Sequence, residues 1–227
     1  MNSQPTAYKA VALPLSYQGI ILIIFSKVNL KIYFYLLIQI FDSMLTREEA
    51  VVLVKENVKK DNLFKHILAV EAIMRGLAKH LGEDEELWGL FGLLHDIDFE
   101  KTFDDPKNHT IFAEEILKGK VPDELIKSIK THNFENTELM PETKMENALI
   151  AADAISGLVV ACAFVMPSKK LSDVKVKTIK KKFKQKDFAR NCSRERILFC
   201  EKVDLEKEFF FEIALKSLQN ISSELEL

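Results

Sequence analysis

The sequence contains few of the residues that form turns and cross-links. Its 227 residues include 7 glycines, 6 prolines and 3 cysteines. So few glycines and prolines argue against the frequent turns of a β-sandwich, whereas the many Leu, Ile, Lys, Glu and Ala residues favour helices. Cys162, Cys192 and Cys200 form no CxxC pair, so neither a disulfide framework nor a zinc finger is expected. The composition predicts an all-α protein in a reducing, cytoplasmic environment.

Several common catalytic motifs are also missing. The chain has no GxSxG elbow, no GxxxxGK[ST] phosphate loop and no GxGxxG after a strand, so acyl-hydrolase, P-loop and Rossmann functions lack their defining residues. The net charge of −2 argues neither for nor against a nucleic-acid partner. Nine lysines fall between residues 169 and 186, and we interpret them as a solvated helix face. Lys186 and Arg190 are the exceptions that we expect to face a site.

The beginning of the chain differs from the rest. Residues 19–41 reach membrane-spanning length, but Lys27 and Lys31 interrupt them, and no small-residue cleavage site follows. Just after Met44, Thr46 and Glu49 match a helix capping box. Residues 1–43 are therefore interpreted as an extension, either spurious with Met44 as the initiator, or a membrane or interfacial anchor, or an extra helix. Residues 44–227 are expected to form the domain.

From Thr46 onward, apolar residues recur at helical spacing. Asn62, Asn108 and Asp204 are the expected N-caps of three helices, and another helix is expected to begin at about Asp84. The apolar run Ala148–Val165 is too rich in alanine and too short to be a membrane span, so it is expected to be a central buried helix. The predicted helices are about 46–59, 62–82, 84–96, 109–119, 122–133, 148–165, 174–184, 193–200 and 204–221.

Four of the five histidines form an ordered series with two aspartates. Imidazole nitrogens together with carboxylate oxygens suit zinc, iron or manganese better than calcium. A carboxylate inside the apolar run is costly unless it is paired or metal-bound, which supports Asp153 as a ligand. The remaining histidine, His80, is left out because it lies near a helix end. The candidate ligands are His66, His95, Asp96, His109, His132 and Asp153.

This series resembles the HD-domain superfamily of metal-dependent phosphohydrolases, in particular its short stand-alone HDIG-type members. The resemblance covers residues 44–227 in length and helical pattern. It implies an HD-domain helical bundle with a C-terminal helical extension. By the same resemblance His66, His95, Asp96 and Asp153 hold one divalent ion. His109 and His132 then add a second ion, with Asp96 bridging the two. Mn, Fe, Zn and Mg are not distinguished.

The resemblance also implies a reaction, which is hydrolysis of a small phosphoester or nucleotide by metal-activated water. Asp96, Asp98 and Lys101 are the predicted catalytic residues. Asp98 stands where the HDIG subgroup has glycine, and it either orients a ligand histidine or is an exposed turn residue. Lys101 and Glu100 either contact substrate phosphate or are solvated.

Two alternative functions remain open at this stage. The same ligands could hold a di-iron centre that activates oxygen, or the domain could bind a ligand without catalysis. Nucleic acid is not an expected partner, and membrane contact is expected only if residues 19–41 are a genuine part of the protein.

Overall fold

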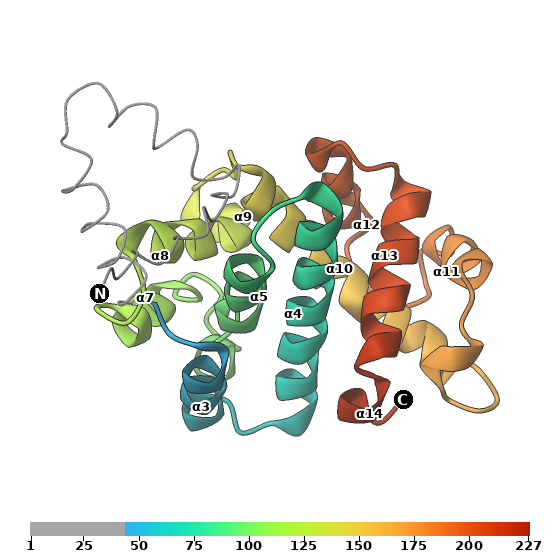
Figure 1. Cartoon of the computed structure of the whole chain (residues 1–227), viewed down its shortest axis with the longest axis horizontal. Coiled ribbons are helices and arrows are strands. Elements are labelled where there is room, and N and C mark those ends of the chain that lie inside the picture. The colour runs from blue at the N-terminus through green and yellow to red at the C-terminus, as the bar shows by residue number, and fades with distance from the viewer. Residues whose placement is uncertain (1–43) are drawn as a thin grey trace, which may run out of the picture.

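The computed structural model describes residues 44–227 (Figure 1). The predictions for residues 1–43 lie outside these residues. Throughout the described part the chain forms α- and 3₁₀-helices, and its only β-type pairing is an isolated bridge between Lys118 and Val121. The predicted all-α fold is confirmed.

Three helices form the first layer of the core. α3 (Arg47–Asn57) begins at the predicted capping box, in which the Thr46 hydroxyl accepts from the Glu49 amide and Glu49 accepts from the Thr46 amide. α4 (Asp61–Leu81) packs against α5 (Glu85–Leu94). The two helices approach closely at Gly92, where an added Cβ atom would lie only 3.0 Å from the Glu71 Cα. The close approach fixes the C-terminal end of α5 beside α4.

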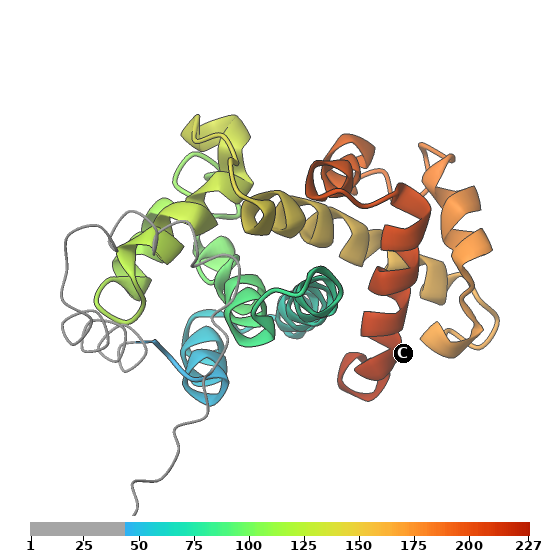
Figure 2. The same cartoon turned by 45° about the horizontal axis from the view of Figure 1, so that its top comes forward.

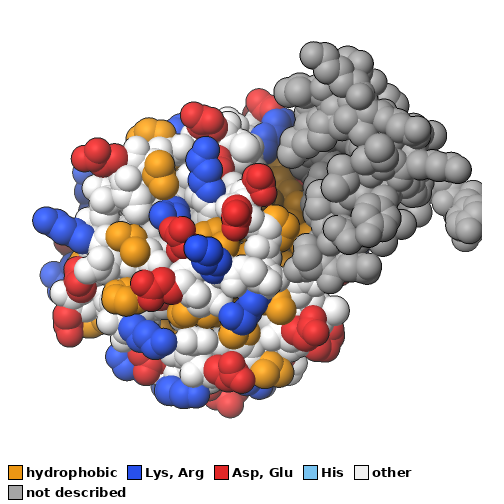
Figure 3. Space-filling model, turned by 90° about the vertical axis from the view of Figure 1, so that its left-hand side faces the viewer, with side chains coloured by type: hydrophobic (Ala, Val, Ile, Leu, Met, Phe, Trp, Pro, Cys, Tyr) orange, Lys and Arg blue, Asp and Glu red, His pale blue; other side chains and the backbone are white. Residues whose placement is uncertain are grey.

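Short helices follow α5 and lead back to the core. They lie on the side of the molecule where α3 also lies (Figure 1). On the face drawn in Figure 3, Lys and Arg side chains are interspersed with Asp and Glu side chains, with hydrophobic side chains between them. The segments are α6 (Phe99–Thr102), α7 (Ile111–Leu117), α8 (Asp123–Lys130), the 3₁₀ turn η1 (Thr131–Asn133) and α9 (Phe134–Thr137).

α10 (Lys144–Phe164) is the central helix, as the apolar run predicts. It crosses the molecule from the α8 and α9 side to the α11 side (Figure 2). A second capping box, Thr143 with Glu146, starts it. Among the described residues α10 alone is long and apolar enough to span a membrane, yet 72% of its most apolar window is buried inside the protein. Its hydrophobicity is therefore explained by core packing.

The C-terminal helices cover the other side of α10. α10 contacts α11, α12, η3 and α13 as well as α4. Trp88, Phe210 and Phe211 are buried in the core, whereas Phe209 is 39% exposed. The segments are η2 (Leu171–Asp173), α11 (Val176–Phe183), α12 (Arg194–Ile197), η3 (Leu198–Val203), α13 (Lys207–Asn220) and α14 (Ser222–Leu225).

The N-caps predicted at Asn62, Asn108 and Asp204 are wrong. Asp84, which is expected only near the start of a helix, caps α5 by accepting from the amides of residues 86 and 87. Asn62 lies inside α4 rather than before it. The residue directly before α7 is Thr110 rather than Asn108, and the residue directly before α13 is Glu206 rather than Asp204. The amides before α4 instead donate to Glu100, at 2.7 and 3.0 Å. A carboxylate from a distant segment therefore binds the backbone just ahead of α4, where no side chain caps the helix.

Candidate metal centre

The six predicted ligands come together from five parts of the chain. His66 lies on α4, the pair His95 and Asp96 directly follows α5, and Asp153 lies on α10. His109 lies in the turn before α7 and His132 in η1. Their ligand atoms form two groups, and within each group the atoms lie within 4.8 Å of one another. One group is His66 with His95 and Asp96, and the other is Asp96 with His109 and His132. Asp96 belongs to both groups.

The two carboxylate oxygens of Asp96 face different pairs of histidines. Oδ2 lies 3.6 Å from the His66 Nε2 and 3.5 Å from the His95 Nε2. Oδ1 lies 3.3 Å from the His109 Nε2 and 3.4 Å from the His132 Nε2. Asp153 completes the first group, because its Oδ1 lies 3.3 Å from the His66 Nε2. The carboxylate of Asp96 thus separates two clusters of possible ligand atoms.

The histidine rings are held through their outer nitrogens. The Nδ1 of His95 donates to the Gly92 carbonyl at 2.7 Å, and the Nδ1 of His132 donates to the Ile129 carbonyl at 2.6 Å. A proton on Nδ1 leaves a lone pair on Nε2, which is the form that binds a metal. The Nε2 of His95 is fully buried and has no hydrogen-bond partner among the described residues. An unpaired buried nitrogen is costly, so a metal ion fits this position.

The electrostatics of the cluster follow from burial and mutual charge. Burial lowers the pKa of His95 to about 4, against the opposing charge of Asp96. Burial also acts to lower the pKa of His109, but hydrogen bonds to Asp96 and Asp98 outweigh it and raise this pKa to about 9. For Asp96 and Asp153 burial acts to raise the pKa, yet the neighbouring histidines lower the pKa of both. Both carboxylates are therefore ionised at neutral pH, as metal ligands must be.

A family model for the HD domain matches residues 63–158. The chain carries an HD domain. This matched range contains all six candidate ligands, and the superfamily that the domain defines consists of metal-dependent phosphohydrolases. No curated protein and no solved structure matches the chain.

Asp98 is fully buried in the HD domain rather than exposed. Its Oδ1 accepts from the His109 Nδ1 at 2.9 Å, and its Oδ2 accepts from the amides of Thr110 at 2.7 Å and Ala113 at 3.0 Å. Thr110 has φ of 76°, a left-handed conformation that a β-branched residue rarely adopts. The bonds to Asp98 hold this strained turn, and with it the ring of His109.

The other predicted catalytic residue lies elsewhere. Lys101 is exposed on α6, and its amine donates to the side-chain oxygen of Asn57 at 3.0 Å rather than to a member of the ligand cluster. Glu100 accepts from the backbone ahead of α4. Lys186 and Arg190, the two cations expected to face a site, are exposed. His80 packs against Phe209, with ring centroids 4.7 Å apart.

The metal centre is accessible from one side. The side chains of His66 and Asp153 are 27% and 25% exposed, whereas that of His95 is fully buried. Asp153 is thus less buried than the apolar run suggests, and it lies with His66 at the open edge of the HD-domain site. This edge is formed by one residue of α4 and one of α10.

Arg196 reaches this edge from outside the HD domain. It lies on α12, and its Nη2 donates to the Asp153 Oδ2 at 3.2 Å and to the His132 carbonyl at 2.7 Å. Sequence reasoning missed it because no spacing links an arginine in the tail to ligands in the preceding helices.

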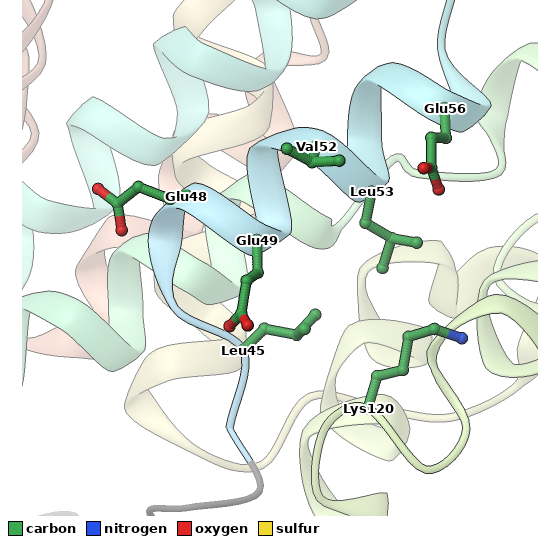
Figure 4. A pocket seen from close by; sticks show the side chains of 7 residues that line it. All are labelled: Leu45, Glu48, Glu49, Val52, Leu53, Glu56 and Lys120. Carbon is green, nitrogen blue, oxygen red and sulfur yellow. The ribbon is translucent and has the colours of Figure 1, made fainter.

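A pocket of about 350 Å³ lies away from the metal centre (Figure 4). α3 and Lys120 form its walls, and none of the six ligands lines it. It therefore gives no support to the HD-domain chemistry. The lining residues are Leu45, Glu48, Glu49, Val52, Leu53, Glu56 and Lys120.

Proposed function

We propose that the protein is a metal-dependent phosphohydrolase that acts on a small phosphoester or nucleotide. One observation carries the proposal, which is the division of the Asp96 oxygens between two pairs of histidine Nε2 atoms at 3.3–3.6 Å. A carboxylate placed in this way is suited to bridge two divalent ions. The proposed ligands are His66, His95, Asp96 and Asp153 for one ion, and Asp96, His109 and His132 for the other.

The expected chemistry follows from such a pair of ions. When bound, they supply a water whose pKa is lowered to about 7 and a clamp for the phosphoryl oxygens. The protein's own part is to fix the ligands. The Gly92 and Ile129 carbonyls orient His95 and His132, and Asp98 orients His109. The exposed edge formed by His66 and Asp153 is where we place the substrate phosphate.

A small substrate is favoured over a polymer. The net charge of −2 alone does not decide between partners, but a compact domain of this charge cannot hold a long polyanion by its overall charge. The lysines of residues 169–186 are the feature that could oppose this view. We therefore include single-stranded RNA among the substrates to be tested.

The test is phosphate release from a panel of phosphomonoesters and nucleotides by the purified full chain. The protein is first freed of metal and then supplied with Mn²⁺, Fe²⁺, Zn²⁺ or Mg²⁺ under anaerobic conditions. His66→Ala and His80→Ala form a matched pair, because both histidines lie on α4 but only His66 belongs to the cluster. Activity should require metal, be lost in His66→Ala together with the ion that His66 helps to hold, and persist in His80→Ala.

Other outcomes would point elsewhere. Oxygen consumption with iron, without anaerobic phosphate release, would replace hydrolysis by di-iron oxygen activation. Tight binding of a phosphorylated ligand without turnover in any metal would indicate a binding module. Faster turnover of RNA than of mononucleotides would overturn the small-substrate proposal.

A further inference from the structure

Arg196 makes contacts to three separate segments around the metal centre. Its Nη1 donates to both oxygens of Glu135, at 3.0 and 2.9 Å, and its Nη2 donates to the His132 carbonyl and to Asp153. Its guanidinium carbon also lies 5.7 Å from the centroid of the Phe134 ring. The side chain is only 19% exposed. These bonds and its low exposure fix the guanidinium in one position.

The contact with Asp153 divides the two oxygens of that carboxylate. Oδ2 accepts from the Arg196 Nη2 at 3.2 Å, while Oδ1 faces the His66 Nε2 at 3.3 Å. Arg196 therefore occupies one oxygen and leaves the other toward the cluster. Because a guanidinium is planar and always charged, it holds the carboxylate plane as well as its charge.

The contact with His132 ties the same guanidinium to the second group of ligands. His132 is held by its own backbone turn, since its Nδ1 donates to the Ile129 carbonyl. Arg196 binds the carbonyl of His132, so it anchors η1 through a second hydrogen bond. One side chain from α12 thus connects Asp153 of the first group with His132 of the second.

We propose that Arg196 is a positioning residue of the metal centre, and that the C-terminal segment carrying it is part of the functional site. Arg196 sets the orientation of Asp153 and the distance between α10 and η1, so that both groups of ligands keep their spacing. The inference rests on the metal site of the proposed function. It goes beyond that function because residue 196 lies outside the matched HD range of 63–158.

A purely electrostatic role predicts the opposite result from a positioning role. Removing a positive charge next to Asp153 would by itself favour a cation and tighten metal binding. Removing a residue that orients a ligand weakens metal binding, typically by about 10- to 100-fold. Metal affinity in Arg196→Ala therefore separates the two roles by the sign of the change.

The experiment is a calorimetric Mn²⁺ titration of the full chain as wild type, Arg196→Ala, Arg196→Lys and Arg190→Ala. Arg190 is exposed on the same segment and serves as the matched control. We expect about 10- to 100-fold weaker binding in Arg196→Ala. Arg196→Lys should also bind Mn²⁺ more weakly, because one ammonium cannot reproduce a planar fork that reaches three segments. Arg190→Ala should bind like wild type.

A double-mutant cycle and a spectrum extend the test. In a background of Asp153→Asn, the substitution Arg196→Ala should weaken Mn²⁺ binding by a smaller factor than in wild type, because part of its effect passes through Asp153 and part through the His132 carbonyl. The visible absorption of bound Co²⁺ should change in Arg196→Ala and stay as in wild type in Arg190→Ala. Circular dichroism of the metal-free proteins checks folding. If Arg196→Ala fails to fold, Arg196→Lys and its cycle with Asp153→Asn decide the matter.

The outcomes separate this inference from the proposed function. A wild-type chain that binds no Mn²⁺, Fe²⁺, Zn²⁺ or Co²⁺ would refute the metal centre itself. Normal binding in wild type with unchanged or tighter binding in both Arg196 variants would overturn the role of Arg196 alone. An equal loss in the Asp153→Asn background would also overturn it, because Arg196 would then have no coupling to Asp153, the ligand that it is proposed to orient.

Discussion

Asp98→Asn is the substitution that tests the metal centre most directly. The carboxylate of Asp98 accepts three buried hydrogen bonds, one at Oδ1 from His109 and two at Oδ2 from the amides of Thr110 and Ala113. Asparagine has nearly the same shape but only one oxygen. If that oxygen keeps the two amides, the new NH₂ group faces the Nδ1 of His109. The neutral ring of His109 must then carry its proton on Nε2 rather than Nδ1, which removes the lone pair that a metal ion needs.

The magnitude of the effect can be worked out from these bonds. A buried hydrogen bond to a charged group contributes about 1.5–3 kcal/mol and a neutral one about 0.5–1.5 kcal/mol. Converting the two amide bonds to the neutral kind therefore costs about 2–3 kcal/mol, and loss of the charged pair with His109 adds about 1 kcal/mol or more. We expect the metal-free variant to lose about 3–4 kcal/mol in free energy of unfolding. For a domain of this size the corresponding fall in Tm is about 6–16 °C.

The assays are urea unfolding of the metal-free protein at pH 7 and metal stoichiometry at saturation. Asp104→Asn is the matched control, because Asp104 is exposed in the loop that follows α6. Asp98→Asn should bind one ion where wild type binds two, and nitrogen NMR of His109 should report the Nε2–H form. Two ions retained, together with less than 1 kcal/mol lost, would refute the role that we assign to Asp98.

Three further predictions follow from the same structure. Joint replacement of His109 and His132 by Ala should reduce the stoichiometry from two ions to one, with His80→Ala as control, and an unchanged count would remove the second ion. In the metal-free protein the pKa of His109 is raised from an ordinary 6.5 to about 9, which stabilises the fold by roughly 3 kcal/mol. This stabilisation is fully present below pH 6.5 and is lost as the pH rises from 6.5 to 9. The lowered pKa of His95, about 4, has the opposite effect, so stability also falls from pH 6.5 toward 4, and urea unfolding across this range should show a maximum near pH 6.5. Deletion of residues 1–43 should leave folding intact, which thermal denaturation can check, whereas aggregation of the shortened chain or stable membrane association of the full chain would favour an anchor.

The ligand set could be predicted because its chemistry is visible in single residues. Histidine and aspartate are scarce enough in an apolar helical pattern that their order points to one site. The structure brings all six together, although only their side-chain types and order were available beforehand. Capping was predicted poorly because the rule is local. Glu100 and Asp98 reach the helix starts near Lys60 and Thr110 from other segments, so no neighbouring residue signals them.

Arg196 could not be predicted for a related reason. It lies 43 residues from Asp153, and only the packing of α12 against α10 brings the two together. Lys186 and Arg190 were better candidates by composition, because Lys186 stands in the lysine-rich stretch and Arg190 follows it closely. The exposed positions of both show that charge density along the chain does not identify which cation meets a ligand carboxylate.

α10 places metal binding and core packing on the same piece of backbone. Asp153 is flanked on this helix by fully buried small residues, among them Ala148, Ala151 and Ala152. A larger side chain at any of them costs about 1–3 kcal/mol or displaces the helix, and a displaced helix carries Asp153 with it. Natural variation and laboratory selection therefore meet the same restriction. Substitutions in this helix that appear to concern stability alone will also change metal affinity, so libraries that target the core of α10 should be screened for both properties together.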